Sequence, residues 1–130
     1  MVIYMKHLIA ALVIVTVFIA GGAVNDRLLQ KYTGEIKGKI DSVERSAGIN
    51  DWDKAADACQ SAGELFVSRQ GFMMCILHHD KIAHIETSVA RIRSYTNNKD
   101  TVLLMAEASA LSTYLDDLSR IDKLTLVNIL

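Results

Sequence analysis

The residues most capable of chemistry gather in one segment, where three of the four histidines of this 130-residue chain stand close together. The segment reads His78-His79-Asp80-Lys81-Ile82-Ala83-His84. Asp80 and His84 are four residues apart, so on a helix they share a face and could bind a divalent metal ion. A complete site needs three or four ligands, and the sequence holds no HExxH or comparable motif. We therefore favour an exposed Asp80–His84 pair, no bound metal, and His78 or His79 partly buried against another helix. A pH-sensing histidine is the remaining alternative.

The two cysteines, Cys59 and Cys75, both fall on predicted core faces. If the turn between their helices is centred near Val67, they lie level and could form a disulfide. If it is centred at Gln70-Gly71, they are offset by roughly 7–8 Å along the axis and cannot. We favour the later turn and two buried free thiols, because Gly71 is the evident helix breaker, and we keep the disulfide as the alternative.

Overall composition excludes several classes of protein. The chain carries 14 Lys and Arg against 15 Asp and Glu, which excludes a strongly basic nucleic-acid binder. It contains no proline and only seven glycines, which disfavours a β-sandwich or barrel. No P-loop, nucleophile elbow or dinucleotide fingerprint occurs. We therefore expect an all-α protein that is not an enzyme, with no cofactor, no nucleic-acid partner and no small-molecule substrate.

The N-terminal segment has the composition of a membrane anchor. Residues Leu8 to Val24 are uninterruptedly apolar apart from Thr16. As a helix this stretch is roughly 26 Å long, near the lower limit for a bilayer core of about 30 Å. A cleaved signal peptide, with Ala20-Gly21-Gly22-Ala23 as the cleavage region, and a buried core helix are the alternatives. We favour an anchor over residues 1–24, because the helical pattern continues past Asn25 without a loop.

The orientation of this anchor follows from the flanking cations. Lys6 and the α-amine favour an N-terminus inside the cell, whereas the cations that follow the span oppose it under the positive-inside rule. We favour the N-terminus inside, as in a signal anchor, which places residues 25–130 outside the cytoplasm. The opposing cations are Arg27, Lys31, Lys37 and Lys39.

Residues 25–130 show the apolar periodicity of an antiparallel bundle of three to four helices. We expect helices over about 24–47, from Asp51 to about Gly71, over about 72–96 and over about 101–121. Gly48 to Asp51 is predicted to be a helix stop followed by an N-cap, and Asp100 to be a second N-cap. The expected core or structural residues are Trp52, His79, Ile82, Ile85, Val89, Ile92, Leu111, Leu115 and Leu118.

These features together resemble an uncharacterised family of short, membrane-anchored proteins from spore-forming Gram-positive bacteria, the domain of unknown function numbered 4363. The resemblance rests on a short anchor, Trp52 opening a helix, the histidine-centred segment from His79 to Ile92, and the ending Leu124-Thr-Leu-Val-Asn-Ile-Leu130. Phe66 stands where the family pattern would have a second tryptophan. The family has no assigned activity, so the resemblance implies location and architecture. It also implies a membrane-protein partner, because members are often encoded beside multi-pass membrane proteins.

Three functional hypotheses follow. We favour a membrane-anchored interaction module that docks on a membrane-protein partner or self-associates. The second is an extracytoplasmic sensor or small-ligand-binding bundle, and the third is a hydrolase or metal enzyme. A filled interior favours the module, whereas a pocket of several hundred Å³ favours the sensor.

Overall fold

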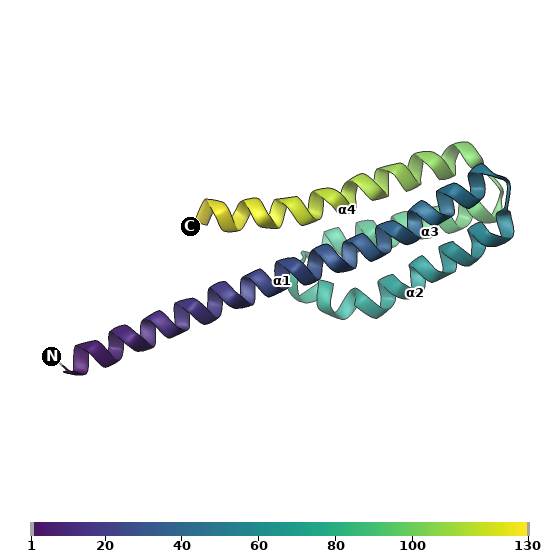
Figure 1. The fold of residues 1–130 in the computed structure, drawn as a ribbon. Coiled ribbons are helices and arrows are strands. Elements are labelled where there is room, and N and C mark those ends of the chain that lie inside the picture. Colours follow the sequence, from purple (N-terminus) through teal and green to yellow (C-terminus); the bar gives the residue numbers. More distant parts are fainter. Residues whose placement is uncertain (1, 130) are drawn as a thin grey trace.

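Four helices make up the backbone of residues 2–129 in a computed structural model, which describes side chains for residues 2–120. The helices are α1 (Val2–Gly48), α2 (Trp52–Ile76), α3 (His79–Asn97) and α4 (Thr101–Ile129). Successive helices run antiparallel, and each packs against its chain neighbours, with α4 returning to close the ring against α1. Figure 1 shows that both chain ends lie on the same side, opposite the α1–α2 and α3–α4 loops. The all-α architecture is as predicted.

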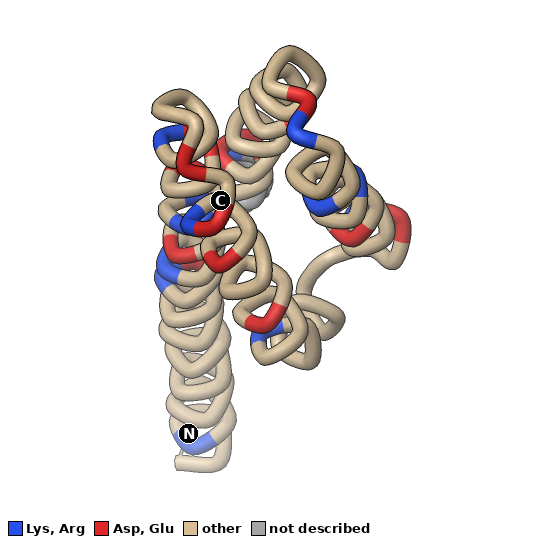
Figure 2. The backbone as a smooth tube through the Cα atoms, turned by 90° about the vertical axis from the view of Figure 1, so that its right-hand side faces the viewer, with Lys and Arg blue, Asp and Glu red and all other residues tan. Residues whose placement is uncertain are grey.

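Helix α1 joins two different environments without a break. Its 47 residues give a length of roughly 70 Å. The part before Leu29 buries no side chain, and it is long and apolar enough to cross a membrane. From Leu29 to Ala47 the same helix buries one residue every three or four, which is the stripe of a bundle helix. Figure 2 shows the uncharged stretch as the tan part of α1 that extends away from the bundle. The continuous helix past Asn25 agrees with the sequence prediction.

The α1–α2 and α3–α4 loops, at the end of the bundle opposite the chain ends, are built in the same way. At the end of α1, the N–H of Asp51 donates to the carbonyl of Ser46 (2.9 Å) and that of Asn50 to Ala47 (3.1 Å). This is a Schellman motif, with Asn50 in the left-handed conformation at φ 60°. The carboxylate of Asp51 then accepts from the backbone N–H of Lys54, so the predicted stop and N-cap are confirmed.

The α3–α4 loop repeats this construction residue for residue. Asp100 and Lys99 donate to the carbonyls of Tyr95 (2.9 Å) and Thr96 (3.1 Å), and Lys99 has φ 53°. The Asp100 carboxylate accepts from the N–H of Leu103, which confirms the second predicted N-cap.

The predicted turn at Gln70-Gly71 is wrong. Helix α2 continues through Gly71 to Ile76, and the chain reverses at Leu77 and His78, which are both extended with ψ 148°. A single glycine weakens a helix by only about 1 kcal/mol. Burial of Phe66 and Met73 on either side of Gly71 outweighs that cost. Leu77, only 6% exposed, leaves the helix with its side chain still in the core.

The core is formed by one stripe from each helix, and most of the predicted core residues lie in it. Trp52 is half-buried and packs against the core. His79 is exposed, which corrects its prediction as a core residue, because α3 begins at this position, directly after the extended residues Leu77 and His78. The predicted residues that are buried are Ile82, Ile85, Val89, Ile92, Leu111, Leu115 and Leu118.

The helical phase of α3 can be tested by comparing two adjacent residues. Ile85 is 0% exposed, so Ile85→Ala leaves a cavity and should lower the free energy of unfolding by about 2–5 kcal/mol. His84 is exposed, with its ring packed against that of Tyr114, so His84→Ala should cost less than about 1 kcal/mol. Thermal and denaturant unfolding of the full chain in detergent measures both. A larger effect from His84→Ala would mean that the buried face of α3 is wrongly assigned.

Candidate functional site: a groove between α2 and α3

The histidine segment does not form a metal site among the described residues. His78, His79, Asp80 and His84 are all exposed, so the expected partial burial of His78 or His79 is wrong. No group of three or more metal-binding side chains lies together within residues 2–120. The ring of His84 instead packs against Tyr114 of α4, with centroids 4.3 Å apart and the planes tilted by 52°. Burial, with a smaller contribution from the charge of Asp80, raises the pKa of Tyr114.

The two cysteines lie on one helix and cannot form a disulfide within the chain. Cys59 and Cys75 both belong to α2, where 16 residues correspond to roughly 24 Å, far beyond the reach of a disulfide. Both are free thiols; Cys59 is buried, whereas Cys75 is exposed. The prediction that Cys75 faces the core is therefore wrong. It assumed a new helix after Gly71, whereas in α2 the buried position is Met73, two residues away and on the opposite face.

Reactivity toward a thiol reagent should separate these two residues. Cys75 is exposed and should react rapidly with a maleimide in the native protein, whereas Cys59 is 2% exposed and its pKa is raised by burial. Mass spectrometry of the full chain should find one adduct before denaturation and two after it. In Cys75→Ser the native protein should remain unmodified. Two unreactive cysteines that become reactive only after reduction would contradict the assignment of free thiols.

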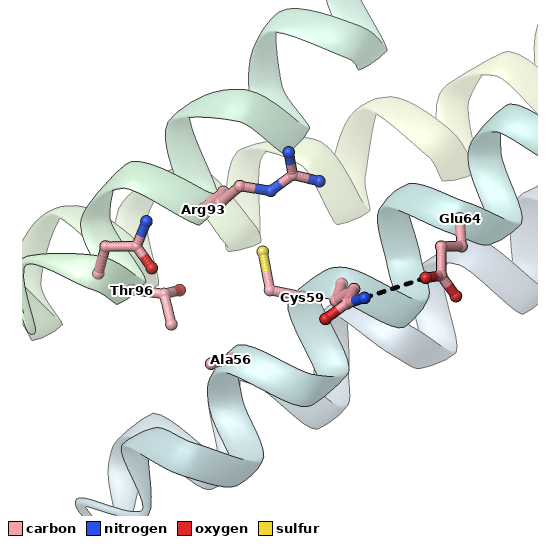
Figure 3. Close-up of a pocket in the computed structure, with 7 residues that line it drawn as sticks. Ala56, Cys59, Glu64, Arg93 and Thr96 are labelled. Atoms are coloured by element: carbon pink, nitrogen blue, oxygen red, sulfur yellow. Dashed lines mark hydrogen bonds between the residues drawn. The ribbon is translucent and has the colours of Figure 1, made fainter.

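Cys59 opens instead onto a groove between α2 and α3. The groove has a volume of about 480 Å³ and is open to solvent. Figure 3 shows the Cys59 sulfur pointing from α2 toward α3, with Arg93 and Thr96 of α3 facing it. On the α2 side, the amide of Gln60 donates to the carboxylate of Glu64 at 3.1 Å. The residues that line this part of the groove are Ala56, Cys59, Gln60, Glu64, Arg93, Thr96 and Asn97.

Arg93 supplies the positive charge of the groove. Its guanidinium lies over Gly63, where a Cβ atom would stand 2.8 Å from one of its terminal nitrogens. A side chain at position 63 would push the guanidinium away, so glycine permits this close approach. Within residues 2–120, Arg93 forms no ion pair. The guanidinium also opposes part of the rise that burial causes in the pKa of Cys59.

The groove continues past Arg93 as a second depression with an apolar wall. This second part has a volume of about 230 Å³. Phe66 is buried and Val67 is exposed, and together with Val89 and Ala90 they give it an apolar wall, whereas Gln70 and Glu86 add polar groups to its lining. A guanidinium beside an apolar wall suits a ligand that is itself amphipathic and carries an anionic group.

Sequence reasoning did not identify Arg93. The histidine segment drew attention because its residue types suggest chemistry, whereas Arg93 is one exposed arginine on a helix with several charges. The available signal was Gly63, a residue without a side chain that stands at helical spacing from Cys59 and Phe66. A glycine there leaves space that a long side chain from the neighbouring helix can occupy.

The fold and the groove define an all-α protein in which a four-helix bundle extends from a long apolar N-terminal helix. The sequence model of one family, described as Domain of unknown function (DUF4363), matches residues 24–129. The chain belongs to this family. No curated protein and no solved structure matches it.

Proposed function

We propose that the protein is a non-enzymatic, membrane-anchored interaction module whose bundle docks on a membrane-protein partner through the α2–α3 groove. The observation that carries the proposal is Arg93, a guanidinium held in an open groove without a carboxylate partner among residues 2–120. An Asp or Glu on a partner helix would pair with it. Apolar neighbours of that acid would then occupy the depression beside Val67 and Ala90.

The anchor in this proposal is the first half of α1. Its large apolar side chains, from Val2 to Val24, are more than half exposed, a continuous apolar surface that lipid would cover and water would not. A retained anchor is supported over a cleaved signal peptide because Ala20 to Ala23 are helical and continuous with the bundle. The flanking charges favour a bundle outside the cytoplasm, with Lys6 inside.

The absence of a catalytic role is supported by the chemistry of the groove. Cys59 is its strongest potential nucleophile, but it is buried and burial raises the pKa of its thiol. An activated cysteine needs the opposite, a lowered pKa and exposure. Glu64, the acid that lines the same part of the groove as Cys59, accepts a hydrogen bond from Gln60 of the same helix. Recognition therefore suits these residues better than acid–base chemistry.

A second candidate function is an extracytoplasmic sensor that binds a small ligand. The volume of about 480 Å³ falls in the range of small-molecule sites, and both a guanidinium and the Glu64 carboxylate line it. A ligand bearing one charge of each sign would match them. The core of the bundle is filled by fully buried side chains, so such a ligand would bind at the surface and not inside.

Site-specific crosslinking tests the docking proposal. The photoreactive residue p-benzoylphenylalanine at exposed Val67 should form an adduct with a membrane protein in the producing cells. Arg93→Gln should reduce the adduct about tenfold or more, since a charge-assisted hydrogen bond contributes about 1.5–3 kcal/mol. The matched control is Arg91→Gln, which removes an exposed arginine that pairs with Glu107 at 3.8 Å. That control should leave the adduct unchanged.

The other outcomes of this experiment are distinct. An adduct with twice the mass of the chain would indicate self-association through the groove. Equal adducts in Arg93→Gln and Arg91→Gln would overturn the groove as the docking site. No adduct, together with a thermal shift by a zwitterionic metabolite that requires Arg93, would establish the sensor instead.

The anchor and its orientation can be tested separately. The intact chain should stay with membranes through carbonate extraction. With Cys75→Ser as background, Lys99→Cys in the exposed α3–α4 loop should react with an impermeant maleimide on intact protoplasts. Reaction only after lysis would place the bundle in the cytoplasm. Recovery of a soluble chain lacking the first helix half would establish the signal peptide.

A further inference from the structure

Two side-chain contacts define the position of the α2–α3 turn along the axis of α1. The rings of Tyr32 and Phe72 meet edge to face with centroids 5.1 Å apart. Three residues further along α1 and three back along α2, Glu35 pairs with Arg69 at 3.4 Å. In antiparallel helices an advance along one matches an equal retreat along the other, so the two contacts define a single register.

This register can be followed from the two contacts to the turn. Leu77 lies five residues beyond Phe72 and is therefore level with Arg27, five residues before Tyr32. The turn thus stands two to three residues beyond Val24, where the apolar stretch of α1 ends. Figure 1 shows the turn beside α1 at the end of the bundle from which the N-terminal half of α1 projects.

The same positions fall within the headgroup layer of a bilayer. A hydrocarbon core of about 30 Å centred on the stretch from Leu8 to Val24 reaches roughly ten residues either side of Thr16, to about Asp26. The headgroup region adds about 5–7 Å, which extends it to about Lys31. By the register above, Met74 to His78 are level with this interval.

The exposed side chains of the turn suit that layer. Met74 is 52% exposed and apolar, and His78 and His79 present rings with an apolar body and a polar N–H. On α1 at the same level, Arg27 and Lys31 are exposed cations that can pair with lipid phosphates. A methionine, two imidazoles and two cations are therefore gathered at the height where acyl chains give way to phosphates.

We propose that the α2–α3 turn is a lipid-contact surface, which sets Met74, His78 and His79 into the phospholipid headgroup layer of the membrane that holds α1. This inference rests on the anchor of the proposed function, but it is independent of what binds the groove. It makes the base of the bundle a second membrane contact, supplied by residues remote in sequence from the span.

Native Cys75 is a probe for this contact, since it is exposed and lies within the same turn of α2. The full chain, labelled there with an environment-sensitive fluorophore, is reconstituted in phosphatidylcholine–phosphatidylglycerol vesicles. A fraction of the lipid carries a nitroxide in its headgroup. Two matched variants in a Cys75→Ser background carry the same fluorophore at Lys31→Cys, on α1 near the same level, and at Lys99→Cys, in the distal loop.

Quenching by the headgroup nitroxide should be about equal at Cys75 and Lys31→Cys, and at least about threefold weaker at Lys99→Cys. Strong quenching at Lys31→Cys with Cys75 as weak as Lys99→Cys would overturn the lipid contact and leave the anchor intact. Weak quenching at all three positions would show that α1 does not hold the chain in the bilayer, which would overturn the anchor and the contact together.

Discussion

The rest of the structure depends on the unbroken backbone of α1 between its exposed apolar half and its buried stripe. A helix satisfies its own backbone hydrogen bonds, so it can leave lipid and enter a protein core without exposing an unpaired group. The first core residue, Leu29, follows the last apolar residue of the exposed stretch, Val24, by five positions. Little more than one turn of helix therefore separates the exposed apolar stretch from the buried stripe, so the proposed anchor and the bundle share one continuous helix.

The ion pairs that α1 forms with α2 and α4 determine which helices lie beside it more than they stabilise the fold. Lys37 pairs with Asp116 of α4 at 2.8 Å, and Glu35 pairs with Arg69 of α2. Both pairs remain partly exposed to solvent, which screens them, so neither contributes much to the stability of the fold. The hydrogen bond to Asp116 raises the pKa of Lys37. Stability comes from the buried stripes, whereas these pairs specify which helix lies on each side of α1.

How much could be predicted from the sequence depended on whether a signal was local. The loop motifs at Asp51 and Asp100 were predicted correctly because a cap is defined by a few adjacent residues. The core of α3 was also correct, since its apolar spacing is regular over three turns. The α2–α3 turn was misplaced because glycine is only a weak helix breaker. The burial of Met73 and Leu77 determines where the chain turns.

That single error accounts for most of the mistaken residues of the candidate site. A turn at Gly71 places Cys75 on the wrong face and puts His78 inside a helix, whereas the true turn leaves both exposed. The groove was not predicted, because Gly63 by itself does not identify Arg93 as the residue that packs over it across two helices. Gly63 and Arg93 are 30 residues apart in the sequence, and they meet only because of the way α2 and α3 pack against each other.

The straight passage of α1 has a mechanical consequence. If α1 spans the membrane as proposed, a tilt of the span in a thinner bilayer turns the bundle end of α1 with it, because the helix is unbroken from Val24 to Gly48. Over those 24 residues, roughly 36 Å, a tilt of about 10° displaces the distal loops by about 6 Å. In the proposed membrane-anchored state, a change in bilayer thickness would therefore shift the lateral position of the loops that hold Asn50 and Lys99.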